Sequence, residues 1–440
     1  MFLDSNDLNS RTVSLNPQWI TRFFGKLDGS RPAIPKATLV VLICWLPYLI
    51  ASIPGVYWND TTWQIVQFSR YADPIIDHYP FLDTIIIGGA ADLSNRLFGN
   101  FTVLLYVLVV IQSVLAAFAF ANMCCKSESL GVSYKARAGL LTFFAVFPFF
   151  PLFFVTLCKD TLFTPFFIFY CFYLACFIFE KQRTYYVDLV RIMFIGIICS
   201  LTRKTGIYIC AGSLLFCVFM NVDFKQKAKI LACVVFIAAI SQIGVPSFVK
   251  NYREISPGGK QEIFALPLQQ VANVIRSEPS LLTSEDWDIV ANTYPIGVDK
   301  LSKAYDWKAA DGVKGYSQPK HADYIRFLQL WVKLGWEKPG SYLGAWLGLN
   351  AGWFTPGYAT ILPVATMQNH AKPIEAFSGW RAQPISGDKL EKFGKTISLL
   401  PLVDFLFSKY LWASVLPAFL VYVLFDRRLR KKRMDLARGC

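Results

Sequence analysis

The class of fold is indicated by residues 100–123, which read NFTVLLYVLVVIQSVLAAFAFANM. No side chain in this stretch is charged, and most of its side chains are apolar. A helix of about 20 apolar residues is long enough to cross the hydrocarbon core of a bilayer. The stretch therefore predicts a transmembrane helix.

Similar stretches recur through the chain. The uncharged ones lie at 37–57, 138–157, 161–179, 205–222 and 230–249, and two weaker ones with a cation near one end lie at 187–202 and 405–425. Only 17% of the 440 residues are charged and 54% are hydrophobic, whereas about a quarter of the residues of a soluble protein are charged. We therefore predict an all-α polytopic membrane protein with eight transmembrane helices, and the composition argues against a cytosolic enzyme or a disordered chain.

The distribution of charge indicates the orientation of these helices. If the N-terminus is cytoplasmic, every connection assigned to the cytoplasm is basic, whereas the first outer loop, residues 58–99, carries five aspartates against two arginines. Basic residues accumulate on the cytoplasmic side of a membrane, so both termini are predicted to be cytoplasmic. Much of the net charge of +14 is then a sign of topology, and it does not indicate a nucleic-acid partner.

This topology divides the chain into five parts. They are a cytoplasmic N-terminal segment (1–36), a transmembrane core (37–249), an extracytoplasmic region (250–403), a last transmembrane helix (404–426) and a basic cytoplasmic tail (427–440). Within the outer region, residues 340–367 are uncharged but interrupted by prolines and glycines, which favours an interfacial or re-entrant segment. Ten helices result if this segment and residues 393–408 also cross the membrane.

Charged residues gather at the predicted outer ends of the helices. Cations on this side are not explained by the accumulation of basic residues on the cytoplasmic side, so they need another reason. They are Asp60, directly after the first span; Asp77 and His78, further along the first outer loop; Lys159 and Asp160, in a turn between two spans; and Arg203 and Lys204, in the next outer break. Acids and cations from separate helices are thus predicted to meet near the outer membrane surface.

This combination of charges suits a lipid-linked phosphate. Carboxylates deprotonate hydroxyl groups or bind divalent cations, and lysine and arginine neutralise phosphate. When a sugar is cleaved from an isoprenoid phosphate, negative charge grows on the phosphate, and fixed cations stabilise it. Asp60 is then the candidate base, with Lys159, Arg203 and Lys204 at the phosphate. Asp60 and Asp77 are also candidate ligands for a divalent cation, Mg²⁺ or Mn²⁺.

Each of these residues also has a purely structural explanation. Lys159 and Asp160 fit a hairpin turn with an exposed ion pair, and Arg203 with Lys204 fits cations that reach up to lipid head groups. Asp60 fits a helix cap. His78, which precedes Tyr79-Pro80, fits a residue that orders a turn. The predicted co-location of these groups favours a functional role.

The outer region, residues 250–403, offers weaker candidates. It has mixed charge and many tryptophans, which suit carbohydrate and membrane interfaces equally. Glu262, Gln269 and Gln270 are candidates for hydrogen bonds to sugar hydroxyls or for helix capping. None of the eleven cysteines lies in this region, so no disulfide framework is predicted.

The order of these motifs resembles that of bacterial polytopic glycosyltransferases of the GT-C superfamily. The resemblance rests on Asp60, Asp77-His78-Tyr79-Pro80, Lys159-Asp160, Arg203-Lys204-Thr205-Gly206 and Leu266-Pro267-Leu268-Gln269-Gln270, and it covers roughly residues 37–357. It is similar in particular to a poorly characterised branch with a Lys-Asp turn and a Pro-Leu-Gln-Gln motif. The resemblance implies a polyprenyl-phosphate sugar as donor and transfer on the outer face of the cytoplasmic membrane. It implies Asp60 as base or metal ligand, Asp77 and His78 as supporting groups, and the cations as contacts to the donor phosphate.

We therefore expect a glycosyltransferase of the bacterial cytoplasmic membrane that moves a sugar to a cell-envelope glycan or lipid, with membrane lipids as its surroundings and no nucleic acid. Two alternatives belong to other classes. A flippase or exporter of lipid-linked sugars would need polar groups on both faces of the membrane and a path between them. A non-catalytic envelope scaffold would tolerate the loss of Asp60.

Overall fold

The computed structural model describes residues 27, 29, 33–69, 75–179, 185–219, 224–251, 254–257, 259–315, 322–356, 367–383 and 388–425. Helices make up nearly all of this part of the chain, and its strands are only two or three residues long. The predicted all-α class is confirmed. The basic tail predicted at 427–440 and most of the N-terminal segment predicted at 1–36 lie outside the described residues.

The chain forms two compact units. Unit 1 comprises Met1–Ile75, Tyr79–Ile255 and Pro363–Glu391, and unit 2 comprises Ile76–His78, Ser256–Leu362 and Lys392–Cys440. Asp60 and the predicted phosphate-binding cations belong to unit 1. Asp77, His78 and the candidates of the outer region belong to unit 2.

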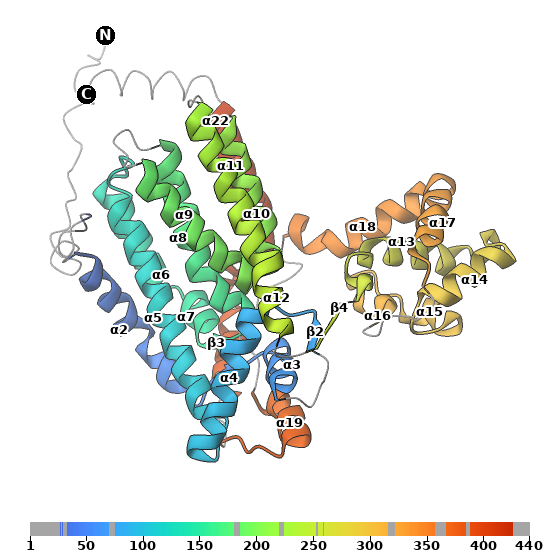
Figure 1. Cartoon of the computed structure of the whole chain (residues 1–440), viewed down its shortest axis with the longest axis horizontal. Coiled ribbons are helices and arrows are strands. Elements are labelled where there is room, and N and C mark those ends of the chain that lie inside the picture. Colours follow the sequence, from blue (N-terminus) through green and yellow to red (C-terminus); the bar gives the residue numbers. More distant parts are fainter. Residues whose placement is uncertain are drawn as a thin grey trace, which may run out of the picture. The chain divides into compact units, whose positions relative to one another are not determined.

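Unit 1 is a bundle of helices (Figure 1). Its helices are α2 (Ala33–Ala51), α3 (Asn59–Phe68), α4 (Phe81–Phe98), α5 (Thr102–Lys126), α6 (Tyr134–Val146), α7 (Phe149–Phe154), α8 (Lys159–Phe179), α9 (Tyr185–Thr202), α10 (Gly206–Val218), α11 (Phe224–Ala239), the π-helical turn η1 (Ile240–Gly244), α12 (Val245–Lys250) and α19 (Met367–Ser378). Two short strands, β1 (Val56–Tyr57) and β3 (Thr156–Leu157), pair with each other inside this unit.

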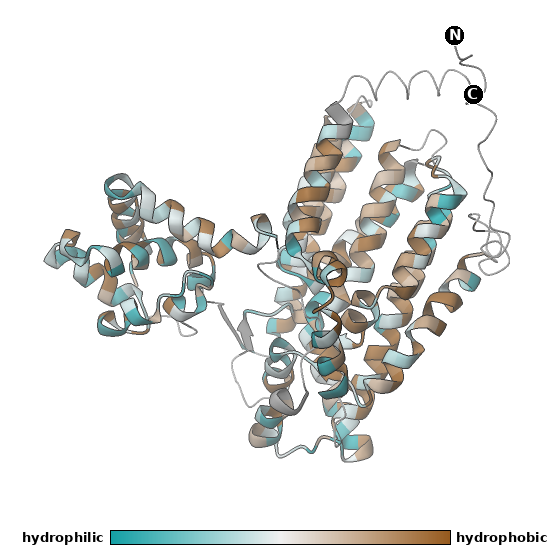
Figure 2. Ribbon diagram, turned by 180° about the vertical axis from the view of Figure 1, so that it is seen from behind, coloured by the Kyte–Doolittle hydropathy of each residue, from teal (hydrophilic) through white to brown (hydrophobic). Residues whose placement is uncertain are grey.

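Four helices in the described part of the chain are long and apolar enough to cross a membrane. They are Ala33–Ala51, Thr102–Lys126, Lys159–Phe179 and Phe224–Lys250, and Gly206–Cys217 and Leu411–Tyr422 are shorter apolar helices. Figure 2 shows hydrophobic residues along the long helices of unit 1. By length and composition, these helices are compatible with a membrane protein.

Helix α2 illustrates the apolar character of these helices on both faces. Ala37, Val41 and Trp45 are buried against the bundle, whereas Leu39 and Ile43 on another face are more than half exposed. A surface helix of a soluble protein presents polar residues on its outer face. The exposed leucine and isoleucine of α2 therefore fit lipid as the surrounding medium.

The run 138–157, predicted as one span, is divided in the structure. Helix α6 ends at Val146, and α7 and β3 follow after a break. Phe147 is in an extended conformation because the ring of Pro148 disfavours the helical conformation of the residue before it. The break turns the chain toward β3, which leads into the candidate site.

Two apolar clusters fill the interior of unit 1. One lies among α2, α5, α6 and α7, where the rings of Trp45 and Phe154 stack with their centroids 5.5 Å apart. The other lies among α8, α9, α10 and α11 and includes Tyr170 and Phe177. Helix α5 also packs against α8, so the two clusters form neighbouring parts of one bundle.

Unit 2 is smaller, and in it α13 (Ala265–Ser277) packs against α15, α16, α17 and α18. Its other elements are η2 (Lys260–Glu262), η3 (Pro279–Leu281), α14 (Ser284–Thr293), α15 (Val298–Ala304), α16 (Asp311–Lys314), α17 (Tyr324–Glu337), α18 (Pro339–Phe354), α21 (Pro401–Phe407), η4 (Leu411–Val415) and α22 (Leu416–Phe425). Helix α20 (Asp388–Ile397) and the paired strands β2 (Ile75–Asp77) and β4 (Ile255–Pro257) occur where the chain passes from one unit to the other. Within the segment predicted as interfacial, residues 340–354 belong to α18.

Candidate functional site

The parallel pair of strands β1 and β3 sets the position of the candidate site. Tyr57 lies opposite Leu157 in this pair. Because the two strands run in the same direction, Asp60, three residues beyond the first strand, comes beside Lys159, two residues beyond the second. The hydroxyl of Thr61 donates a hydrogen bond to the backbone oxygen of Leu157 at 2.7 Å, which holds the start of α3 against β3.

Helix α5 holds β3 in place through one buried side chain. The amide nitrogen of Gln112 donates to the backbone oxygens of Phe154 at 2.7 Å and Thr156 at 2.9 Å. Its amide oxygen accepts a hydrogen bond from the hydroxyl of Thr161 at 3.1 Å. Gln112 is buried, so water does not compete for these bonds. The turn that carries Lys159 is therefore fixed from two sides.

Two ion pairs lie next to each other at the start of α8. The Nζ atom of Lys159 lies 2.6 Å from Oδ2 of Asp60, and the carboxylate of Asp160 is paired with the guanidinium of Arg203. These residues come from α3, α8 and the turn before α10, so the structure brings together three segments that are far apart in the chain. The side chain of Lys159 is 24% exposed and that of Arg203 is 40% exposed, which leaves the cluster accessible.

The turn between α9 and α10 fixes the position of Arg203. Its Nε atom donates to the hydroxyl of Thr205 at 3.0 Å, and its guanidinium carbon lies 5.6 Å from the centroid of the Phe163 ring. The turn is tight because it contains Gly206. A Cβ atom at this position would lie 2.3 Å from the backbone oxygen of Cys199, so glycine is required for the observed approach of α9 and α10.

Other predicted site residues have different surroundings. Lys204 is exposed in the same turn as Arg203, and His78 is half-buried in the turn after β2. Asp77 belongs to β2, and its side chain lies outside the described residues. Tyr79 does contribute to the candidate site, because the centroid of its ring lies 5.4 Å from the Nζ atom of Lys159, within the range of a cation–π interaction.

The candidates from the outer region hold unit 2 together. Glu262 forms an ion pair with Lys314 at 2.7 Å. The amide oxygen of Gln270 accepts from the indole of Trp331 at 2.8 Å, and its nitrogen donates to the backbone of α18. Gln269 is buried, and its amide donates to the backbone beyond α15. These contacts stabilise the packing of α13 against its neighbours.

The structure adds two residues that the sequence analysis did not select, Asp83 and Gln64. Both are buried, on α4 and α3 respectively. Burial raises the pKa of Asp83 well above its usual range, and the charge of Asp160 adds to this rise while that of Lys159 opposes it. One feature of the sequence could have indicated Gln64: it follows Asp60 by four residues and so lies on the same face of a helix.

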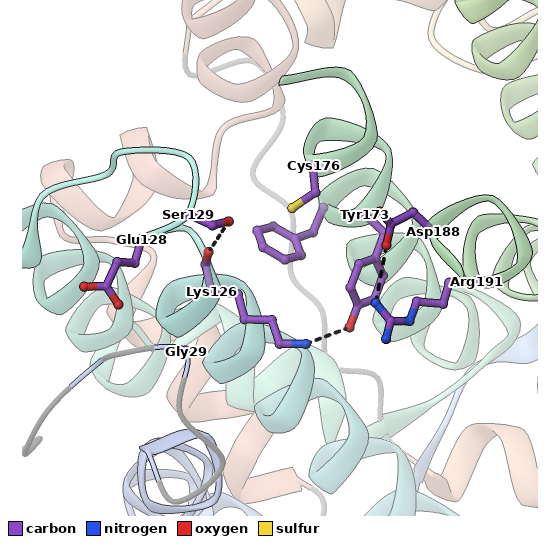
Figure 3. Close-up of a pocket in the computed structure, with 9 residues that line it drawn as sticks. Gly29, Lys126, Glu128, Ser129, Tyr173, Cys176, Asp188 and Arg191 are labelled. Atoms are coloured by element: carbon purple, nitrogen blue, oxygen red, sulfur yellow. Dashed lines mark hydrogen bonds and ion pairs between the residues drawn. The ribbon is translucent and has the colours of Figure 1, made fainter. Parts of the chain in front are cut away.

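A pocket of about 380 Å³ lies near the other end of α8 (Figure 3). Its lining residue Tyr173 is about 21 Å along the helix from Lys159, at 1.5 Å per residue. The hydroxyl of Tyr173 accepts a hydrogen bond from Lys126 at 3.4 Å, and Arg191 pairs with Asp188 at 3.4 Å. Glu128 also lines the pocket, so its two cations are matched by two carboxylates. The ion pairs at the start of α8 show the same balance of two cations and two carboxylates.

The described residues do not provide a set of ligands for a metal ion. In the part of the chain that the structure describes, no three His, Cys, Asp or Glu side chains gather in the manner of a metal site. The carboxylate of Asp60, a candidate ligand, is engaged by the ammonium of Lys159. Divalent cations of the Mg²⁺ type take several oxygen ligands. The side chain of Asp77, the second candidate ligand, lies outside the described residues, so a metal ion at Asp60 stays a prediction.

The fold and the site define a helical protein with membrane-compatible helices and a cluster of ion pairs where α3, α8 and the turn before α10 meet. The chain belongs to the family described as "Family of unknown function (DUF6020)", whose model matches residues 72–432. No curated protein and no solved structure matches the chain.

Proposed function

We propose that this protein is a membrane glycosyltransferase of the GT-C type that transfers a sugar from a polyprenyl-phosphate donor to a cell-envelope glycan or lipid. The observation that carries the proposal is the pair of adjacent ion pairs, Asp60 with Lys159 and Asp160 with Arg203. A carboxylate for a hydroxyl proton and two cations for a phosphate are thus within reach of one substrate.

The proposal includes the arrangement of the chain in a bacterial cytoplasmic membrane. Eight crossings are α2, α5, α6 with α7, α8, α9, α10, α11 with α12, and η4 with α22. The basic end of α5, at Lys126, is cytoplasmic by the positive-inside rule. Helices α6 and α7 lead away from that face and α8 runs back toward it, so the first residues of α8, Lys159 and Asp160, meet the outer surface.

The ion pairs compensate the charges of the site when no substrate is bound. In the resting cluster two carboxylates balance Lys159 and Arg203, so neither cation is left unpaired in a partly buried place. A phosphate that enters provides Lys159 with a second anionic partner. Its hold on Asp60 then weakens, and the carboxylate of Asp60 becomes able to accept a proton.

The reaction is a single displacement at the anomeric carbon of the sugar. The oxygen of the acceptor hydroxyl forms a bond to this carbon while the bond from the carbon to the phosphate oxygen breaks. The electron pair of the broken bond stays on the phosphate, and the hydroxyl proton passes to Asp60. The phosphate gains about one negative charge, which Lys159 and Arg203 stabilise more strongly than they stabilise the donor.

The arrangement favours an enzyme over an exporter of lipid-linked sugars. An exporter needs a polar path across the membrane. In the described part of unit 1, the helices between the candidate site and the pocket near Tyr173 enclose apolar clusters.

The test is turnover by the full chain, purified in detergent, with a panel of polyprenyl-phosphate sugars and envelope acceptors. The measured quantity is released polyprenyl phosphate. Asp60→Asn is expected to lower the rate by about 10²- to 10⁴-fold, the usual worth of a general base. Lys159→Met is expected to lower it by about 10²- to 10³-fold.

The matched control is Arg326→Gln, which removes an exposed ion pair with Glu285 in unit 2. This variant should keep the rate of the unmodified protein. Release by Asp60→Asn at the rate of the control would remove Asp60 from the mechanism. No release with any donor would favour an exporter or a scaffold.

A further inference from the structure

Unpartnered polar atoms are concentrated around α3 and the start of α4. The described residues there include the indole nitrogen of Trp58, both amide atoms of Gln64 and both carboxyl oxygens of Asp83, all buried without a hydrogen-bond partner. Gln64 and Asp83 have no exposed surface. Buried polar groups in proteins almost always have partners, so a cluster of exceptions calls for an occupant.

These groups lie beside the proposed catalytic cluster in unit 1. Gln64 is one helical turn beyond Asp60 on the same face of α3, and Trp58 directly precedes that helix. Helix α4 packs closely on α3. A Cβ atom on Gly88 would lie 2.1 Å from Cβ of Phe68. Asp83, in the first turn of α4, interacts electrostatically with residues of the ion pairs.

The chemistry of the three groups differs from that of the ion pairs. An indole N–H donates one hydrogen bond, and a glutamine amide both donates and accepts. Burial raises the pKa of Asp83, which favours the neutral carboxyl, a group that also donates and accepts. None of the three therefore attracts an anion. Mixed neutral donors and acceptors match hydroxyl groups, whereas Lys159 and Arg203 match phosphate.

We propose that Trp58, Gln64 and Asp83 bind the hydroxyl groups of the donor sugar while Lys159 and Arg203 bind its phosphate. The inference rests on the proposed function and adds a site for the sugar. Asp60, which is about one third exposed, lies at the open end of the row that continues to Gln64. This order places the proposed base between the solvent and the sugar, where an acceptor hydroxyl arrives.

The experiment compares two lipids, polyprenyl phosphate and the polyprenyl-phosphate sugar that the unmodified protein binds most tightly. Affinities are measured for the full chain in detergent. In the double variant Gln64→Leu/Asp83→Leu, the dissociation constant for the sugar-bearing lipid should rise by about tenfold or more, the worth of one or more lost hydrogen bonds. Its dissociation constant for the bare lipid phosphate should stay within about twofold.

A matched control is Gln270→Leu, which removes a buried glutamine of unit 2 whose partners are inside the protein. This variant should unfold at a lower temperature, with the ratio of the two affinities unchanged. Asp83→Asn is the conservative variant: an amide keeps the shape and neutral character of the protonated carboxyl, so it should retain most of the preference for the sugar.

The outcomes separate this inference from the proposed function. If the unmodified protein and the double variant bind both lipids equally well, the sugar site is wrong while a phosphate site stands. If the double variant unfolds at a higher temperature and keeps its preference for the sugar, the buried groups hold water only, which overturns the inference. If no lipid phosphate binds the unmodified protein, both proposals fail.

Discussion

Replacement of Gly206 by alanine probes how closely the function depends on the position of Arg203. The added Cβ would lie 2.3 Å from the backbone oxygen of Cys199, and ordinary contact begins at about 3.4 Å. The start of α10 and the end of α9 must therefore separate by about 1 Å. Overpacking of this kind costs about 1–3 kcal/mol of stability.

The consequence for activity follows from the same displacement. The turn that moves contains Arg203 and Thr205, which share a hydrogen bond. A displacement of about 1 Å at a positioning group lowers the rate of an enzyme by up to about 10²-fold. Gly206→Ala should therefore lower the release of polyprenyl phosphate and the temperature of unfolding together.

The chain offers a close control on the same helix. A Cβ atom on Gly212 in α10 would have no neighbour within 4 Å, and alanine in a helix is more stable than glycine by about 0.5–1 kcal/mol. Gly212→Ala should thus keep full activity and unfold at an equal or higher temperature. The reasoning is refuted if Gly206→Ala behaves as Gly212→Ala does in both measurements.

Three further predictions concern acid–base behaviour and topology. The fold raises the pKa of Asp83 above its ordinary value of 3.8, so the contribution of Asp83 to stability is fully present below pH 3.8 and is lost as the pH rises toward the raised pKa. Asp83→Asn should remove this loss from the pH dependence of the unfolding temperature. An unchanged pH dependence in the variant would contradict the prediction. Burial alone would raise the pKa of Asp286, but hydrogen bonds from Lys333 and Thr283 outweigh it and lower the pKa below 3.8, so its contribution is present above that pH and is lost as the pH falls through the lowered pKa. Asp286→Asn should cost about 1 kcal/mol of stability at neutral pH and should flatten the fall in unfolding temperature at acid pH. An equal loss of stability at every pH would contradict a stabilising role for the charge of Asp286. A fluorescent protein fused to the C-terminus should fluoresce and a phosphatase fused there should be inactive, because the tail is predicted to be cytoplasmic; the opposite pair of results would reverse the proposed orientation.

The helical class could be predicted because long apolar runs have few alternatives. Residues 100–123 carry no charged side chain, and the structure has α5 there. The break in the run 138–157 was harder to predict. Pro148 and Pro151 were visible in the sequence, but proline also occurs inside long helices of this chain, at Pro47 and Pro165. Tertiary packing decides between a kink and a break.

The cluster of ion pairs was predictable from the order of charges along the predicted spans, because the predicted topology places these charges at one surface. The particular pairs were not. Lys159 meets Asp60 because two strands of two residues each pair in parallel, and so short a strand leaves no pattern of alternation to detect. Asp83 was hidden for another reason: one aspartate among five in a predicted loop gives no sign of burial.

The central claim is that Lys159 and Arg203 bind a lipid-linked phosphate. The most direct test is the affinity of the full chain in detergent for polyprenyl phosphate, compared with uncharged polyprenol of the same length. We predict that the phosphate binds more tightly, and that the double variant Lys159→Met/Arg203→Gln loses about 10- to 100-fold in affinity for each cation removed, while Arg326→Gln does not. Equal binding of phosphate and alcohol, or equal binding by the double variant and the control, would contradict the claim.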